Sequence, residues 1–429
     1  MVKPFVFFAA AAFALMLGGC APHSAAFAPI EKELMGGNPK AALAQLDKQK
    51  PAAGDRLLHL LNRAMLLRMS GEYAASNAAF ESAKKTMESF DVASVTEQAG
   101  TFILNDSTAA YAGEEFEQVF VHIYSALNYL ELGDLYGARV EALQADVRLT
   151  EMALRGFKGD YREDALARYL SGVVFEALGD ESDAMIAYRK AYQTYLSYEK
   201  HFQLPPPPQL KADLLRLSDR MGLKDENRRF QESFGMTRWQ PMLPGSGEGE
   251  AVVIASVGLA PIKREESTMV HAASGRLVRV SLPRYETRPR YATALRVQGA
   301  NRTSLGVRYH DISAVARHIL EVKRPVITAR AIARVIVKDN VARETEKRSG
   351  QLAGLVANIA AVMTETADTR SWLTLPDEVY IARLRLPPGV YTLEADVLGY
   401  GGGVLMRRTF EQVEIKAGKT RFFTPHFIR

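Results

Sequence analysis

Three glycines in the first half of the chain are each followed by small or aromatic residues at the same three offsets. The offsets are five, nine and twelve positions, and an apolar stretch precedes each glycine, over residues 57–69, 119–132 and 169–178. A glycine can end one helix, and small residues let the next helix pack closely. The pattern therefore predicts repeated helix–turn–helix units. The sets are Gly71 with Ser76, Phe80 and Ala83; Gly133 with Ala138, Ala142 and Ala145; and Gly179 with Ala184, Tyr188 and Ala191.

These units resemble the tetratricopeptide helix-turn-helix repeat. A weaker fourth unit begins at Gly37, which lies 34 residues before Gly71, the period of that repeat. The other spacings depart from the period, so the array is irregular, and a generic antiparallel helical bundle is the alternative. The resemblance implies a helical domain over residues 20–243 with a surface that binds protein segments.

A flexible linker is expected at residues 244–250, where glycines and a serine follow Pro244. Within the helical half, Pro205–Pro208 predicts a rigid spacer. Residues 21–249 carry 25 Lys+Arg against 32 Asp+Glu, whereas residues 250–429 carry 28 against 17. The acidic first half and the basic second half indicate a division of function or contact between the two halves, and two separately solvated surfaces are the alternative.

Residues 251–429 are expected to form an α+β domain, which makes the whole chain a multidomain protein of the α then α+β class. Strands are predicted at 251–256, 277–282 and 292–297, and a helical insertion at about 311–366. Pro325 is expected to interrupt that insertion. After Pro376 the alternation of apolar and polar residues predicts strands to the end of the chain, arranged as a small β-sandwich-like unit.

The stretch 349–364 contains no charged residue. As a helix it rises about 24 Å, which is short of the roughly 30 Å hydrocarbon core of a membrane. We therefore expect a helix buried in this domain, with Gly350 and Gly354 allowing a neighbour to approach. Contact with lipid or with another subunit is the alternative.

The first twenty residues have the features of an export signal. Lys3 gives a positive start, an apolar run follows, and the run ends in Leu17-Gly18-Gly19-Cys20. This ending resembles the bacterial lipobox, which implies a signal peptide over residues 1–19 and lipidation of Cys20. Residue 21 is Ala and not Asp, so the resemblance implies an outer-membrane location, with the body on the periplasmic side. Cys20 is the only cysteine, which excludes a disulfide within the chain.

Motifs for chemistry are weak in this sequence. Gly418-Lys419-Thr420 lacks the earlier glycine of a phosphate-binding loop, since position 413 is Val, and a hairpin turn explains it better. His310 and His318 would lie about 12 Å apart along one helix, too far to share a metal, and are expected at the surface. We predict that the protein is not an enzyme, with no catalytic residue, no metal ligand, no cofactor and no nucleic-acid partner.

The segment 367–376 includes Asp368, Arg370 and Trp372. Asp368 could pair with Arg370 while Trp372 anchors the loop in the core. The alternative is a docking site for a partner, because Trp and Arg dominate the binding energy of many interfaces. The structural interpretation is preferred, and these three residues are kept as possible docking residues.

The lipobox, the segments 291–295 and 330–334, and the segment 367–376 together resemble a family of largely uncharacterised proteobacterial lipoproteins with tetratricopeptide-like N-terminal regions. The resemblance covers most of the chain. It implies small partner lipoproteins similar to the curli secretion channel, and a role as a protein-binding scaffold in envelope assembly or secretion. The alternative function is an envelope enzyme that acts on peptidoglycan or glycan through an unrecognised site in residues 251–429.

Overall fold

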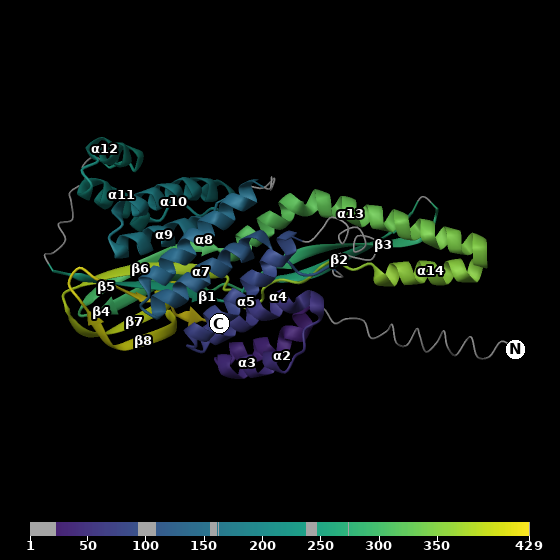
Figure 1. The fold of residues 1–429 in the computed structure, drawn as a ribbon, viewed down its shortest axis with the longest axis horizontal. Helices are drawn as coiled ribbons and strands as arrows, with labels where there is room; N and C mark the ends of the chain where they lie inside the picture. The colour runs from purple at the N-terminus through teal and green to yellow at the C-terminus, as the bar shows by residue number, and fades with distance from the viewer. Residues whose placement is uncertain are drawn as a thin grey trace.

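The structure is a computed structural model that describes residues 23–92, 109–154, 161, 163–236, 247–272 and 274–428. A helical N-terminal part is followed by a part built mostly of strands, so the expected order of α then α/β is confirmed (Figure 1). Cys20 and the lipobox lie outside the described residues, as do residues 244–246 of the expected linker. The remainder of that linker is short, because the first strand begins at Gly249.

The described first part of the chain consists of helices, and the longest intervals between them lie between residues 92 and 115 and between residues 154 and 165. These helices are α2 (His23–Met35), α3 (Pro39–Asp47), α4 (Arg56–Met69), α5 (Tyr73–Val92), α7 (Glu115–Glu131), α8 (Leu135–Leu154), α9 (Ala165–Leu178), α10 (Glu181–Phe202), α11 (Pro208–Arg220) and α12 (Lys224–Ser233). Three prolines, Pro205 to Pro207, separate α10 from α11. Pro208 is the first residue of α11, where a missing backbone N–H costs nothing.

The helix-pair pattern of the sequence is realised at its glycines. Gly71, Gly133 and Gly179 have φ values of +83°, +75° and +88°, the left-handed conformation that ends a helix. The residues at the three offsets after each of these glycines are buried, and none of them is more than 6% exposed. Close approach is extreme at Gly172 of α9, where a Cβ atom would lie 2.4 Å from the ring of Tyr188 on α10. The small side chains at these positions therefore determine how closely the paired helices pack.

The second part is dominated by one eight-stranded sheet. Its order is β10-β1-β6-β5-β4-β7-β8, with β9 also paired to β1, while β2 and β3 form a separate two-stranded ribbon. The strands are β1 (Gly249–Val257), β2 (Ile262–His271), β3 (Leu277–Glu286), β4 (Ala292–Gly299), β5 (Arg302–Asp311), β6 (Glu378–Leu386), β7 (Gly389–Gly399), β8 (Val404–Ile415), β9 (Thr420–Phe423) and β10 (His426–Phe427).

The expectation of a small terminal β-sandwich is not met. The strands after Pro376 pair with strands from before the helical insertion: β6 with β1 and β5, and β7 with β4. Pairing of this kind depends on contacts between residues 67 to 137 positions apart, which the local alternation does not encode. Strands β1, β3 and β4 lie where strands were predicted. Strands β2 and β5 were not predicted. Strand β2 is rich in charged residues and largely exposed, so its sequence lacks an apolar pattern.

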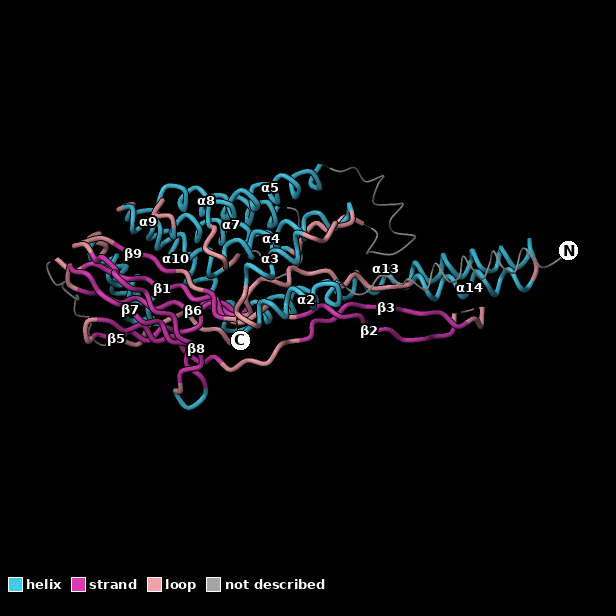
Figure 2. Tube along the Cα trace, turned by 90° about the horizontal axis from the view of Figure 1, so that it is seen from below, coloured by secondary structure: helices cyan, strands magenta, loops and turns pink. Residues whose placement is uncertain are grey.

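The two halves share one hydrophobic core. Val252 and Ile254 of β1 belong to the same buried cluster as Phe120 and Tyr124 of α7, while the alternate residues of β1 belong to a second core on the other face of the sheet. Helices α7 to α10 cover the first face (Figures 1 and 2). The helical and strand-rich parts are therefore packed against each other.

The helical insertion projects from this body as an arm. Helix α13 (Ile312–Ser349) continues through Pro325, so the expected interruption there is wrong. It turns at Gly350 and returns as α14 (Gln351–Thr364), with the β2–β3 ribbon alongside (Figure 2). Gly354 faces α13, since a Cβ atom there would lie 2.5 Å from the Cβ of Glu346. Close packing of α13 against α14 therefore needs glycine at position 354.

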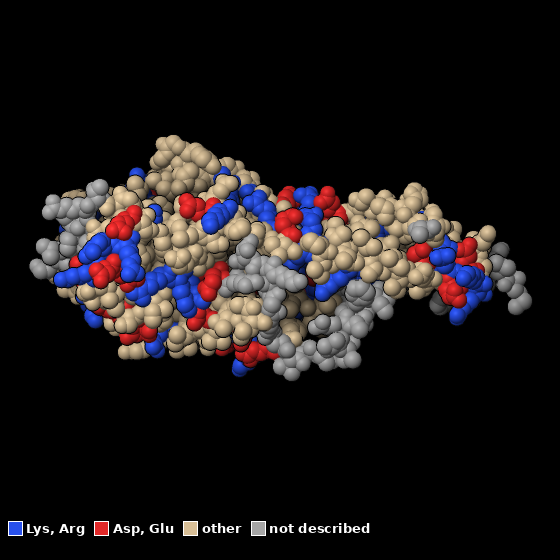
Figure 3. All heavy atoms as spheres, turned by 90° about the horizontal axis from the view of Figure 1, so that it is seen from above, with Lys and Arg blue, Asp and Glu red and all other residues tan. Residues whose placement is uncertain are grey.

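The expected burial of the uncharged helix is also wrong. Leu352, Leu355, Val356 and Ile359 of α14 are exposed, by between 40% and 80%. The helix contacts α13 and β3 on one side, and within the described residues no third layer covers the other side. Figure 3, which views the arm from its α13 side, shows a largely uncharged surface along the arm, with charged residues at its tip. No helix in the described ranges is long and apolar enough to cross a membrane.

Candidate functional site

The segment with Asp368, Arg370 and Trp372 forms hydrogen bonds that connect the strand-rich part to the helices. Arg370 donates to Asp368 (Nη2–Oδ2 2.7 Å) and to Asp55, which precedes α4 (Nη1–Oδ1 3.0 Å). Burial tends to lower the pKa of Arg370, but hydrogen bonds to Asp368 and Asp55 raise it overall, so the guanidinium stays charged. The pairing of Asp368 with Arg370 is confirmed, and it includes a partner from the other half of the chain.

Trp372 is fully buried. Its ring packs edge-on against Phe80 of α5, with ring centroids 5.9 Å apart, and its indole N–H donates to Thr374 Oγ1 at 2.9 Å. Its backbone N–H donates to Glu117 Oε1 at 2.7 Å. These contacts describe the structural role that the sequence favoured, because a partner could reach the Trp372 ring only if the ring left the core.

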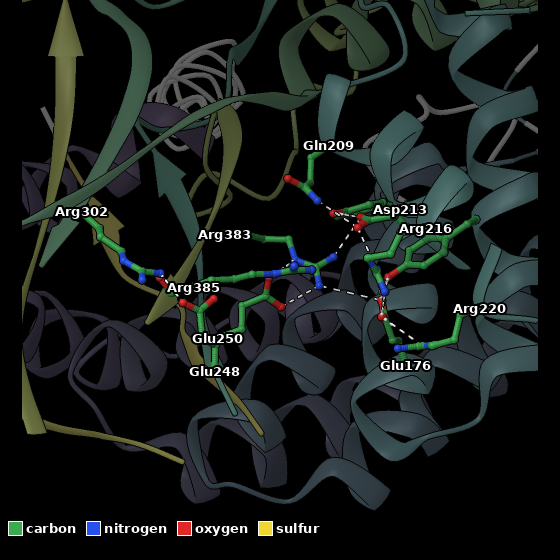
Figure 4. Close-up of polar contacts among 12 residues, drawn as sticks. Glu176, Gln209, Asp213, Arg216, Arg220, Glu248, Glu250, Arg302, Arg383 and Arg385 are labelled. Atoms are coloured by element: carbon green, nitrogen blue, oxygen red, sulfur yellow. Dashed lines mark hydrogen bonds and ion pairs between the residues drawn. The ribbon is translucent and has the colours of Figure 1, made fainter. Parts of the chain in front are cut away.

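A cluster of charged side chains lies where α9 and α11 meet the sheet (Figure 4). At its centre, Arg383 of β6 pairs with Glu250 of β1 (Nη2–Oε2 2.6 Å) and with Asp213 of α11 (Nη1–Oδ2 2.9 Å). Arg216 of α11 bridges Asp213 and Glu176 of α9, at 3.0 Å and 2.5 Å. The cluster joins four elements from both halves, and residues as far as 207 positions apart meet in it.

Glu176 and Arg383 are held in their charged states. Burial alone would raise the pKa of Glu176, but the positive charges of Arg383 and Arg216 outweigh it and lower that pKa to about 2. Burial alone would lower the pKa of Arg383, but the charges of Asp213 and Glu250 outweigh it and raise that pKa well above its ordinary value. A carboxyl with so low a pKa is a poor proton donor near neutral pH. The gathering of carboxylates is therefore explained by ion pairing and does not favour the enzyme alternative.

A pocket of about 180 Å³ opens beside the cluster, with Gly418-Lys419-Thr420 on its wall. Gly418 has a φ of +64° and lies in the turn that leads from β8 into β9. The turn was foreseen, but β8 and β9 pair with other strands and so do not form a hairpin. A phosphate-binding loop leads into a helix N-terminus, which supplies the N–H groups, whereas this turn leads into a strand. The geometry therefore does not support nucleotide binding at this turn.

The histidines do not form a metal site. His310 is completely buried, contrary to the expected surface position, and its Nε2 lies 2.9 Å from Asp164 Oδ2. Tyr161 donates to the same carboxylate oxygen at 2.9 Å, and His318 packs instead against Phe202 and His201. Within the described ranges, no group of three or more His, Cys, Asp or Glu side chains could hold a metal ion.

An exposed apolar stripe runs along α8. It consists of Tyr136, Val140, Leu143, Val147 and Leu154, which are between 42% and 81% exposed. Their spacing places them on one face of the helix, opposite the buried face formed by the small residues after Gly133. A helix at the surface of a helical domain normally presents a polar outer face. Helix α8 instead carries a second apolar face, which the other described residues leave exposed. The first four of these residues are spaced 4, 3 and 4 positions apart in the sequence, a helical pattern that we did not single out in the sequence.

Comparison with known proteins gives little guidance. No family model and no curated protein matches the chain. Among solved structures, BtubC (BKLC) from P. vanneervenii is similar over 48% of this chain and 76% of that one, with 15% identity and a TM-score of 0.30. A likeness this weak identifies neither a fold family nor a function.

Proposed function

We propose that this protein is a scaffold that binds other proteins on the periplasmic side of the outer membrane, anchored there by lipid on Cys20. The observation that carries the binding role is the exposed apolar stripe on α8, because it offers a row of large side chains at helical spacing. An apolar row of this kind suits the apolar face of an amphipathic helix from a partner protein. The anchor rests on the lipobox-like Leu17–Cys20 sequence.

The helix pairs are interpreted as tetratricopeptide-like repeats. The positive φ of the turn glycines and the burial at all three offsets support this interpretation. Stacked pairs of this type present an extended surface to a partner. In the proposal α8, the second helix of the Gly133 pair, supplies part of that surface, and a small lipoprotein similar to the curli secretion channel is the expected partner.

The test places a photo-crosslinking amino acid at Tyr136 of the full-length protein in living cells. We expect a discrete crosslinked product that disappears in a Val140→Glu, Val147→Glu variant, because two carboxylates would remove the apolar stripe without disturbing the buried face of α8. Ser82→Glu, which places a charge on an exposed face of α5, serves as the control and should leave the product unchanged. A crosslinking pattern that is the same in both variants would contradict the proposal.

A further inference from the structure

The large sheet curls until its two edges face each other. Strand β8 ends the sheet on one side, and on the other side β9 and β10 lie along β1. The edges come together at the start of β1, where a Cβ atom on Gly249 would lie 2.2 Å from the carbonyl oxygen of Lys416. Further along, the rings of Phe410 and Phe423 touch, with centroids 4.5 Å apart. The sheet is therefore an incompletely closed barrel, with a seam between β8 and β9–β10.

Two pockets lie along this seam, and both are lined by Phe410 and Phe423. The narrower one, of about 560 Å³, lies between the end of β8 and β9. The wider one, of about 820 Å³, lies between the start of β8, β10 and the turn from α4 to α5. Together they follow most of the 12 residues of β8. The two pockets meet at Phe410 and Phe423, and together they are called the groove.

The groove contains hydrogen-bonding capacity that the chain does not use. Among the described strands, β8 has a neighbour only in β7, so the opposite row of its backbone N–H and C=O groups faces the groove. In the wider pocket, His426 Nε2 and Arg68 Nε are buried and have no hydrogen-bond partner among the described residues. Buried polar atoms without partners are rare in folded proteins, and a strand edge this long is usually covered. Both features indicate a missing occupant.

The charges along the groove favour an acidic occupant. Ion pairs with Asp396 and Glu414 neutralise Arg407 and Lys416. Among the other charged residues that line the groove, Arg408, Lys419 and Arg421 have no ion-pair partner within the described part of the chain, against one such carboxylate, Glu411. The charge of Glu131 lies near that of Arg68. Carboxylates on an occupant would satisfy these three charges.

We propose that an extended, acidic segment of a partner protein inserts into this groove as an additional β-strand, pairing with β8 and completing the barrel. Addition of a strand to a free sheet edge supplies backbone hydrogen bonds that depend little on sequence, and the side-chain pockets and charges then select the partner. The phenylalanine pair provides apolar contact for alternate residues of the inserted strand. This site lies on the sheet edge and is separate from the α8 stripe.

The experiment uses the purified full-length protein and three fluorescent ten-residue peptides. The first alternates Glu with Val, the second has Lys in place of Glu, and the third keeps Glu but replaces two central Val residues by Pro. We expect fluorescence anisotropy to show binding of the first peptide, with at least tenfold weaker binding of the other two. Hydrogen exchange should slow in residues 404–415 and 420–427 when the first peptide binds.

Matched variants test the location. Arg408→Glu combined with Arg421→Glu should weaken binding of the acidic peptide at least tenfold, whereas Arg330→Glu combined with Lys347→Glu, on the exposed arm, should leave it unchanged. Equal binding of the lysine or proline peptide would overturn the proposal, as would binding without slower exchange in β8. If phosphatidylglycerol vesicles and not the peptide slow hydrogen exchange in residues 404–415, the occupant of the groove is lipid and the proposal is wrong. If exchange slows because the protein self-associates, as measured by sedimentation, the occupant is a second copy of the chain and the proposal is likewise wrong.

Discussion

Replacing Arg383 by Met tests the energetic role of the ion-pair cluster. The substitution keeps most of the side-chain volume but removes the charge that pairs with Glu250 and Asp213. The Asp213 side chain is completely buried and that of Glu250 is 12% exposed, so the carboxylates would lose a partner in a poorly solvated place. Removing one partner of a buried ion pair typically costs about 3–5 kcal/mol. Because Arg216 still contacts Asp213, we expect the free energy of unfolding to fall by about 3 kcal/mol, at the lower end of that range.

The measurement is urea unfolding of the purified protein followed by circular dichroism. Arg228→Met is the matched control, because Arg228 pairs with Asp225 at an exposed surface site and should contribute little. The double variant Arg383→Met, Glu250→Gln should recover part of the loss, since it no longer leaves the Glu250 carboxylate buried without a partner. A loss of less than about 1 kcal/mol in Arg383→Met, or a double variant as unstable as the two single changes added together, would refute the reasoning.

Three further predictions follow from other parts of the chain. Burial raises the pKa of Glu117 to about 7, so the folded protein retains a proton that the unfolded chain releases, and stability should fall by about 3 kcal/mol as pH rises from about 4.5 to 7. Denaturation of Glu117→Gln at several pH values should show that this decrease is gone. Ala138→Trp, at a fully buried position of α8, should lower stability by about 1–3 kcal/mol, measured by thermal melting. Cys20→Ser should abolish acylation in metabolic labelling with a fatty acid, and normal labelling would contradict the lipobox interpretation.

The sequence by itself determined the features that depend on neighbouring residues. Gly133 and Gly179 adopt the positive φ that ends a helix, and the residues that follow them at fixed offsets are buried. Both properties are local, because they depend on backbone freedom and on one helical period. The apolar alternation of β7 was readable for the same reason.

Tertiary structure decided the rest. Helix α13 passes through Pro325 where the local rule predicts an interruption, and α14 lies exposed although it carries no charge. The cluster around Arg383 and the seam between β8 and β9 bring together residues that no local pattern connects. The burial of a side chain and the partner of a strand edge depend on which distant surfaces meet, so they are properties of the folded chain as a whole and not of any segment in it.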